Sequence, residues 1–241
     1  MKKHFQVIAA LMLILSACGK NTDIPVNPDP QSNADKVLAF IHSMGYTAGS
    51  IVDNGDAYIV AGDVRFPKNM QVPDSKANTE QRWTGSKISV ANALNVRIKI
   101  DPSISVMSAE INGAVNLWNT AGAPGLHISV VTGAAYDILI KDTNLGTGIC
   151  GQGTFPSGGA AGALIQINKS FITGNSFAQR QRTIAHEIGH NISLMHTNEA
   201  GGLLIPGSQP DLISLMNGGQ CNSGATTLSP KDKNAVKWLY P

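Results

Sequence analysis

Residues 186–196 read HEIGHNISLMH and hold three histidines and a glutamate at the spacing of a metal site. Residues four apart share one face of a helix, so His186 and His190 can direct ring nitrogens at one ion while Glu187 lies beside it. Neutral imidazoles suit zinc, and three protein ligands leave the fourth tetrahedral position open for water, as in catalytic zinc sites. A sharp turn directly after the helix would add His196. The sequence therefore predicts a zinc site with these three histidines as ligands.

Glu187 is the predicted catalytic residue of this site. Zinc lowers the pKa of a bound water from about 15.7 to about 7, and a carboxylate within hydrogen-bond reach can then take its proton. A lone HExxH in a helix is often accidental. Here the third histidine at the right distance favours a metal site over a chance pair on a helix surface.

The spacing HExxHxxxxxH, followed by SLMNG at residues 214–218, resembles the metzincin metallopeptidases, whose motif precedes a Met-turn. The motif HEIGH at residues 186–190 is most similar to the bacterial dual-action HEIGH metallopeptidases, and this resemblance runs from about residue 35 to the end. It implies an α+β, zincin-like catalytic domain: a twisted mixed sheet of about five strands, three main helices, a zinc cleft and a Met-turn in which Met216 forms an apolar floor. It also implies a zinc-dependent metalloendopeptidase that hydrolyses peptide bonds.

Two further residues stand out against that family pattern. Ser193 occupies the place midway between the second and third histidines, where the family has glycine. A serine with positive φ there would cost about 1–2 kcal/mol. Asp63, in the segment GDVRF, resembles a fixed feature of the family, and a carboxylate from a pro-segment could cap zinc. An ordinary turn aspartate is the interpretation that we favour for Asp63 from sequence.

The N-terminus has the features of an export signal. Lys2 and Lys3 precede an apolar run that ends in Leu-Ser-Ala-Cys, which resembles the bacterial lipobox with Cys18 as the lipidated residue. The apolar run is too short for a transmembrane span. An ordinary signal peptide cleaved elsewhere is the alternative. The sequence predicts an exported lipoprotein attached to the bacterial outer membrane or cell surface.

Charge and cysteine content limit the partners. The chain has 18 Lys and Arg against 16 Asp and Glu, and removing residues 1–17 would leave equal numbers. No basic patch with interleaved aromatic residues is present, so nucleic acid is not an expected partner. With Cys18 lipidated, Cys150 and Cys221 remain as a pair that an oxidising compartment would favour as a disulfide. The alternative is that the thiolate of Cys150 binds zinc as an inhibitor.

The pattern of residue types divides the chain into four parts: a signal peptide (1–17), a proline-rich tether (18–34), a small N-terminal segment or propeptide-like subdomain (35–86) and a catalytic domain (87–241). Period-two runs predict strands, and helical stripes with caps predict helices. The expected helices are 35–44, 108–120, about 176–192 and 229 onward, and the expected strands are 50–52, 57–60, 96–100, 127–132, 136–140 and 163–168. The resemblance makes residues 163–167 an edge strand that pairs with substrate. The glycine-rich residues 151–162 are expected to form a flexible rim of the cleft.

The function expected from these patterns is a lipid-anchored zinc metalloendopeptidase acting on a protein or peptide substrate. Two alternatives stay open from sequence. One is a non-catalytic surface adhesin or peptide-binding lipoprotein on the same zinc fold, which Ser193 keeps under consideration. The other is hydrolysis of peptide crosslinks in the cell wall, which uses the same chemistry on a different substrate.

Overall fold

A computed structural model describes residues 32–72, 81–199, 201–206 and 211–241. Its helices are α1 (Asn33–Ser43), α2 (Val90–Ala93), α3 (Ser108–Asn119), α4 (Lys169–Ile172), α5 (Phe177–Asn191) and α6 (Pro230–Leu239), with 3-10 turns η1 (Ala48–Ser50) and η2 (Pro102–Met107). Its strands are β1 (Ile51–Asp53), β2 (Ala57–Val60), β3 (Val64–Pro67), β4 (Gln81–Trp83), β5 (Val96–Ile100), β6 (Ile128–Val131), β7 (Ile138–Asp142), β8 (Gly151–Thr154), β9 (Leu164–Ile167) and β10 (Leu203–Ile205).

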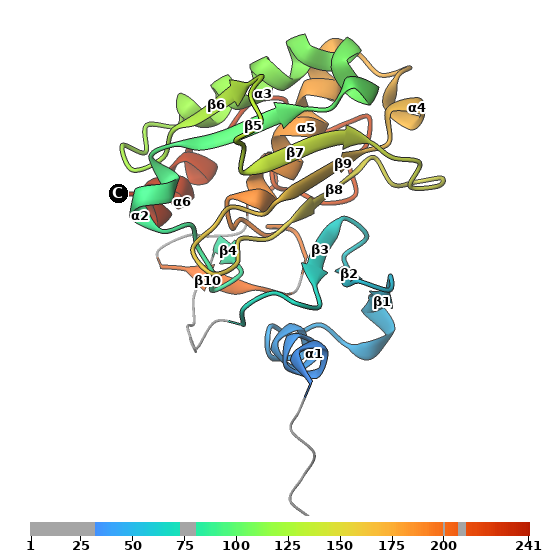
Figure 1. Ribbon diagram of the computed structural model, residues 1–241, viewed down its shortest axis with the longest axis vertical. Coiled ribbons are helices and arrows are strands. Elements are labelled where there is room, and N and C mark those ends of the chain that lie inside the picture. Colours follow the sequence, from blue (N-terminus) through green and yellow to red (C-terminus); the bar gives the residue numbers. More distant parts are fainter. Residues whose placement is uncertain (1–31, 73–80, 200, 207–210) are drawn as a thin grey trace, which may run out of the picture. The chain divides into compact units, whose positions relative to one another are not determined.

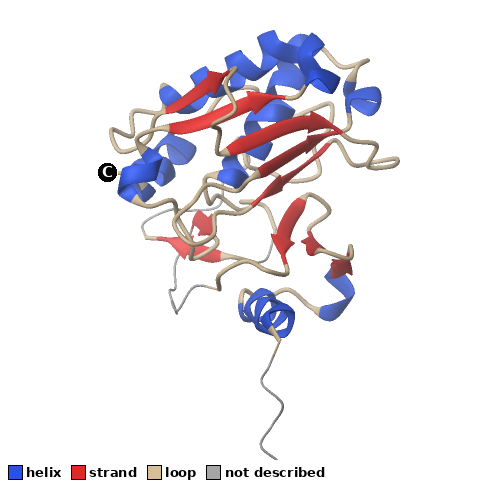
Figure 2. Cartoon of the chain, viewed as in Figure 1, coloured by secondary structure: helices blue, strands red, loops and turns tan. Residues whose placement is uncertain are grey.

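One mixed sheet of eight strands forms the centre of the fold, in the order β1-β2-β3-β8-β9-β7-β5-β6 (Figures 1 and 2). Strands β6, β5, β7 and β9 run parallel, β8 is antiparallel to β9, and β3 joins β8 in parallel. A separate two-stranded sheet pairs β4 with β10. The expected α+β class is confirmed, but the sheet is larger than the five strands expected, because β1, β2 and β3 extend it past β8.

The position of the expected edge strand was wrong. Residues 164–167 form β9, which lies between β7 and β8 and is therefore paired on both sides. Residues 151–162 were expected to form a flexible rim of the cleft, yet residues 151–154 form the strand β8. Glycine weakens a strand intrinsically, which hides such a strand in sequence, but it is used where another backbone approaches closely.

Helix α5 is that close neighbour, and it positions the HEIGH motif. Ser176 caps its N-terminus by accepting a hydrogen bond from the Gln179 amide. The helix ends at Asn191, as expected, and packs against α3, β8 and β9. Trp118 of α3 donates from Nε1 to the Ala185 carbonyl at 2.8 Å inside the core. Burial on both sides therefore fixes the rotation of α5.

In the described part of the chain, no helix is both long enough and apolar enough to cross a membrane. The predicted signal peptide and lipidation site Cys18 lie outside the described residues.

Candidate metal centre

His186 and His190 project from the same face of α5, one turn apart, as their spacing requires. The Nδ1 of His186 faces the Leu215 carbonyl at 3.0 Å, and the Nδ1 of His190 faces the Leu194 carbonyl at 2.8 Å. A carbonyl can only accept, so each Nδ1 carries the ring proton and each Nε2 presents its lone pair. Both rings are thus held in the tautomer that binds a metal through Nε2.

His196 joins these two because the chain reverses directly after α5. Leu194 donates from its amide to the Gly189 carbonyl at 2.9 Å, which closes the turn. Ser193 takes φ +92° within it, the left-handed conformation that favours glycine. Its buried hydroxyl donates to the Ser86 carbonyl and lies 3.1 Å from Thr84 Oγ1. The strained turn is therefore held by side-chain hydrogen bonds that a glycine could not make.

The predicted Met-turn lies beneath the cluster and is tied to α6. Asp232, in the first turn of α6, accepts from the Leu215 amide at 2.9 Å and from the Ser214 hydroxyl at 2.5 Å. This fixes the Leu215 carbonyl that orients His186. Met216 is buried against Gly189 of α5, where an added Cβ would overlap its thioether. The glycine of HEIGH thus makes room for the methionine floor.

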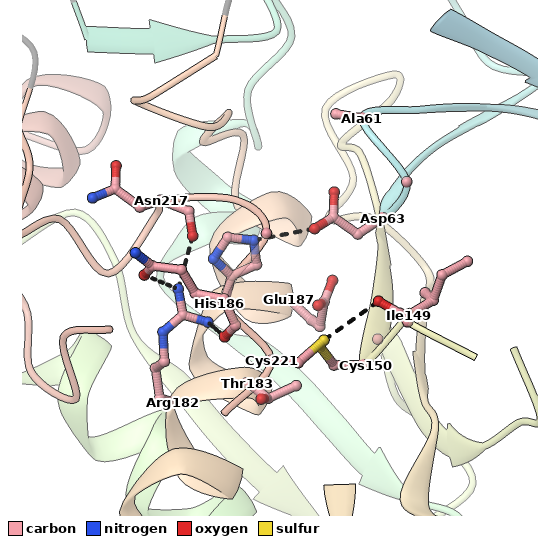
Figure 3. A pocket seen from close by; sticks show the side chains of 15 residues that line it. Ala61, Asp63, Ile149, Cys150, Arg182, Thr183, His186, Glu187, Asn217 and Cys221 are labelled. Atoms are coloured by element: carbon pink, nitrogen blue, oxygen red, sulfur yellow. Dashed lines mark hydrogen bonds and ion pairs between the residues drawn. A yellow bond between two sulfur atoms is a disulfide. The ribbon is translucent and has the colours of Figure 1, made fainter. Parts of the chain in front are cut away.

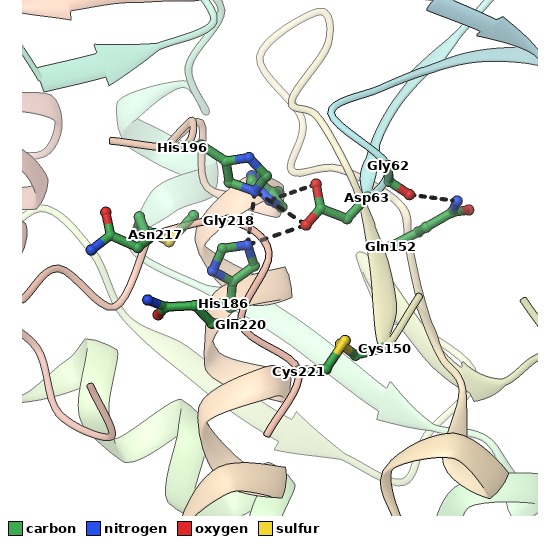
Figure 4. Close-up of polar contacts among 12 residues, drawn as sticks. Gly62, Asp63, Cys150, Gln152, His186, His196, Asn217, Gly218, Gln220 and Cys221 are labelled. Atoms are coloured by element: carbon green, nitrogen blue, oxygen red, sulfur yellow. Dashed lines mark hydrogen bonds and ion pairs between the residues drawn. A yellow bond between two sulfur atoms is a disulfide. The ribbon is translucent and has the colours of Figure 1, made fainter. Parts of the chain in front are cut away.

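Asp63 lies in the histidine cluster, and the turn-aspartate interpretation that we favoured from sequence was wrong (Figure 4). Its Oδ2 is 3.1 Å from His196 Nε2 and 3.5 Å from His186 Nε2, and its Oδ1 is 3.9 Å from His190 Nε2. One ligand atom from each of these four residues lies within 4.8 Å of the others. The four residues form a metal-binding constellation with one carboxylate opposite three imidazoles.

The donor set fits zinc. The Nε2 atoms of His186 and His196 lie 3.0 Å apart, and the Nε2 of His190 is buried with no hydrogen-bond partner among the described residues. Lone pairs of buried nitrogens directed at one another are costly unless a cation lies between them. Three imidazoles and a carboxylate oxygen are ligands that zinc binds in tetrahedral geometry. Glu199 Oε2, 3.0 Å from His196 Nδ1, adds an acidic partner behind the third ligand.

Burial dominates the electrostatics of the site. Burial raises the pKa of Glu187 well above its usual value, and the nearby Asp63 carboxylate raises it further. Burial likewise lowers the pKa of His190 far below its usual value. For His196 the lowering by burial is outweighed by Asp63, which with Glu199 raises its pKa to about 10. Glu187 is therefore a carboxylate that gains a proton readily, as a proton shuttle must.

A pocket opens beside Glu187 and His186 (Figure 3). Its wall includes Cys150, directly before β8, and Cys221, after the Met-turn, which are joined in a disulfide. The inhibitory-thiolate alternative for Cys150 is thereby excluded. Arg182, one turn before His186 on α5, donates to the carbonyls of Asn217 and Gln220 at 2.7 Å and so holds the opposite wall.

Comparison with known proteins agrees with this geometry. A family model described as dual-action HEIGH metallo-peptidase matches residues 54–208, well over half of the chain. The chain belongs to this family. As a HEIGH metallopeptidase it is a zinc-dependent hydrolase of the metzincin type, and zinc is its metal. No curated protein matches it.

The solved structures that match this HEIGH metallopeptidase share little sequence with it. Two structures of myroilysin have TM-scores of 0.47 and 0.49 at 13% and 14% identity, covering 80% and 66% of this chain and 95% and 98% of theirs. High choriolytic enzyme 1, a hatching enzyme zinc-protease from the medaka fish Oryzias latipes, has a TM-score of 0.45 at 16% identity, covering 68% of this chain and 98% of its own.

Sequence reasoning placed the three histidines and Glu187 but missed three charged residues that support the site. Asp232 lies in the first turn of the helix expected from residue 229 onward, and that position gave no sign that it also holds the Met-turn. Arg182 and Glu199 carried no signal, because single charged residues on a helix or in a loop are ordinarily solvent-exposed. The family resemblance of the segment GDVRF was the sequence feature that pointed to a role for Asp63.

Proposed function

We propose that this metallopeptidase is an endopeptidase in which His186, His190 and His196 hold zinc and Glu187 is the general base. The observation that carries the proposal is the convergence of three imidazole nitrogens beside a buried carboxylate, with two of the rings oriented by backbone carbonyls. When bound, zinc would polarise the scissile carbonyl and lower the pKa of the attacking water. Glu187 takes the proton of that water and passes it to the leaving nitrogen.

Strand β8 supports the interpretation as an endopeptidase. Gly151 lies against the Glu187 carboxylate, and Gly153 lies against His190 one pleat further along. The strand thus runs past Glu187 and His190 instead of ending beside them. An extended peptide paired with β8 through main-chain hydrogen bonds would continue on both sides of the scissile bond. The substrate would therefore be an internal stretch of a peptide or protein, including a crosslinking peptide of the cell wall.

The test is hydrolysis of a mixed peptide library by the full chain purified in detergent, with zinc and with a chelator. Glu187→Ala should lower turnover by at least a thousandfold while zinc stays bound at one equivalent, because the carboxylate acts on protons rather than on the metal. His190→Ala should lose the zinc itself. Full activity in the Glu187→Ala protein would refute the role of Glu187. Stoichiometric zinc with no cleavage of any peptide, in wild type or in an Asp63→Asn chain, would favour the adhesin or peptide-binding alternative.

We also propose that Cys18 carries a lipid that attaches the enzyme to the outer membrane or cell surface. The support is the sequence alone: a charged start, a short apolar run and Leu-Ser-Ala directly before Cys18. Stable anchoring needs more than one acyl chain, which a diacylated and N-acylated cysteine would supply.

A Cys18→Ala chain should therefore fail to remain in the envelope fraction that retains wild type, with intact mass spectrometry reporting the missing lipid. Equal retention of both proteins, with no lipid mass on either, would show an ordinary signal peptide instead.

A further inference from the structure

We propose that residues 32–72, here called the cap segment, are a built-in inhibitor of the enzyme. In this proposal Asp63 takes the coordination position that water needs, and β3 takes the strand position that a peptide needs. The inference rests on the proposed function, since it concerns access to that same site.

The turn between β2 and β3 aims Asp63 at the histidines. Ala61 has φ +53° and Gly62 has φ +86°, so two consecutive residues take left-handed conformations. This is unfavourable for alanine, and such strain persists only where the surroundings impose it. The carboxylate that follows is only 17% exposed and faces all three Nε2 atoms.

Strand β3 uses the hydrogen-bonding edge of β8. The Gly153 amide donates to the Asp63 carbonyl at 3.0 Å, and the Gln152 side chain donates to the Gly62 carbonyl at 3.2 Å. Val64 is paired with Gly153 in parallel register. The group presented to the histidines is thus a side-chain carboxylate, while the neighbouring backbone carbonyls are turned to β8. The cap segment fills the cleft without offering it a bond to cut.

The cap segment is built as a unit with its own core. The described residues form two clusters of buried apolar side chains, and the smaller one has twelve members. Ten of these twelve belong to the cap segment: Val37, Phe40, Ile41, Met44, Tyr46, Tyr58, Val60, Val64, Phe66 and Met70. Among the other described residues, only Phe155 and Met195 enter that core. Most of its apolar burial is therefore internal, so the segment can move away from the cleft with limited loss of buried surface.

Little room is left beside Glu187 and His186. The pocket at Glu187 has a volume of about 80 Å³, and Ala61, Gly62 and Asp63 form part of its wall. Such a volume holds several water molecules but no extended peptide. A substrate must therefore displace β3 and Asp63 before it reaches Glu187.

The experiment compares the full chain with Asp63→Asn and with Asp53→Asn, the same isosteric change at an exposed carboxylate of the cap segment that binds Lys68. All three are made in the Glu187→Ala background, so that no chain can cut itself, and are loaded with zinc. Binding of a tripeptide hydroxamate, which chelates the metal without being cleaved, is measured by calorimetry. Apparent affinity falls with the fraction of molecules that are open, so we expect Asp63→Asn to bind at least about tenfold more tightly than the other two.

Phe66→Ala is the second variant, and it leaves the metal site untouched. Phe66 is fully buried and lies 4.8 Å, centroid to centroid, from the Phe155 ring, so its truncation loosens the cap segment at a distance from Asp63. It should also tighten hydroxamate binding. Equal affinity in all four proteins would overturn the proposal, whether or not Asp63→Asn folds well.

The same changes in chains that retain Glu187 separate this inference from the peptidase assignment. Asp63→Asn and Phe66→Ala should then hydrolyse the peptide library faster than wild type and Asp53→Asn. Tighter hydroxamate binding without any hydrolysis would keep the inhibitor and refute the peptidase. Equal hydrolysis by all four chains, together with equal hydroxamate affinity, would keep the peptidase and refute the inhibitor.

Discussion

At the scale of single residues, Ser193 shows how a departure from a family pattern is accommodated. Its positive φ costs about 1–2 kcal/mol relative to a relaxed serine. Each net hydrogen bond of its hydroxyl, to Ser86 and Thr84, returns about 1 kcal/mol. The two effects nearly offset one another, so the turn that delivers His196 does not require glycine.

This balance predicts different outcomes for two substitutions at Ser193. Ser193→Gly loses the hydrogen bonds but also the strain, and should change the free energy of unfolding by less than about 1 kcal/mol. Ser193→Ala keeps the strain and loses the bonds, and should destabilise by about 1–3 kcal/mol. Urea denaturation of the zinc-loaded proteins measures both. Equal destabilisation by glycine and alanine would mean that backbone strain contributes little here.

Residue-level prediction succeeded where chemistry depends on spacing along one element and failed where it depends on distant segments. His186, Glu187 and His190 follow from helical periodicity alone. The approach of Asp63 does not, because it requires the sheet to bring β3 alongside β8, more than 80 residues later in the chain. The sequence indicated that a positive φ at Ser193 would be strained. It did not indicate the partners of the Ser193 hydroxyl, because these depend on where residues 84–86 lie.

At the scale of elements, β8 and α5 are fitted to each other by glycines. Gly151 and Gly153 face the helix, where added Cβ atoms would lie 2.7 Å from Glu187 Oε1 and from the Glu187 carbonyl. The intervening Gln152 contacts the cap segment instead. Because composition argues against a strand at this position, the element was missed from sequence, whereas the β-branched strands β5 and β7 were located.

Gly151→Ala should therefore impair catalysis selectively. Its methyl group would push the Glu187 carboxylate from its place, and small displacements of a catalytic group can cost about 10²-fold in rate. We expect a fall in kcat of that order in an uncapped chain such as Asp63→Asn, with zinc still bound at one equivalent. Gly133→Ala, where an added Cβ meets nothing within 4 Å, is the matched control. Unchanged kcat in Gly151→Ala would show that Glu187 has room to adjust.

At the scale of the whole molecule, the family resemblance predicted the class of fold and the order of elements, but the extent of the sheet came only from the structure. The predicted boundary between residues 86 and 87 remains a prediction. Strand β3 pairs with β8 across it, so the sheet is continuous from the N-terminal strands to β6. Strand pairing between distant segments depends on tertiary packing, which local patterns of hydrophobicity do not contain.

The disulfide between Cys150 and Cys221 gives the cleft a property that no hydrogen bond supplies. It joins residues 71 apart in sequence, one directly before β8 and one beyond Met216. Closing a loop of that length lowers the entropy of the unfolded chain by an amount equivalent to about 4 kcal/mol. Cellular thiol reductants prevent such a bond from persisting in the cytosol. Completion of the cleft thus depends on the redox state of its surroundings: before oxidation the two walls are held by packing and hydrogen bonds, and afterwards their spacing is fixed covalently.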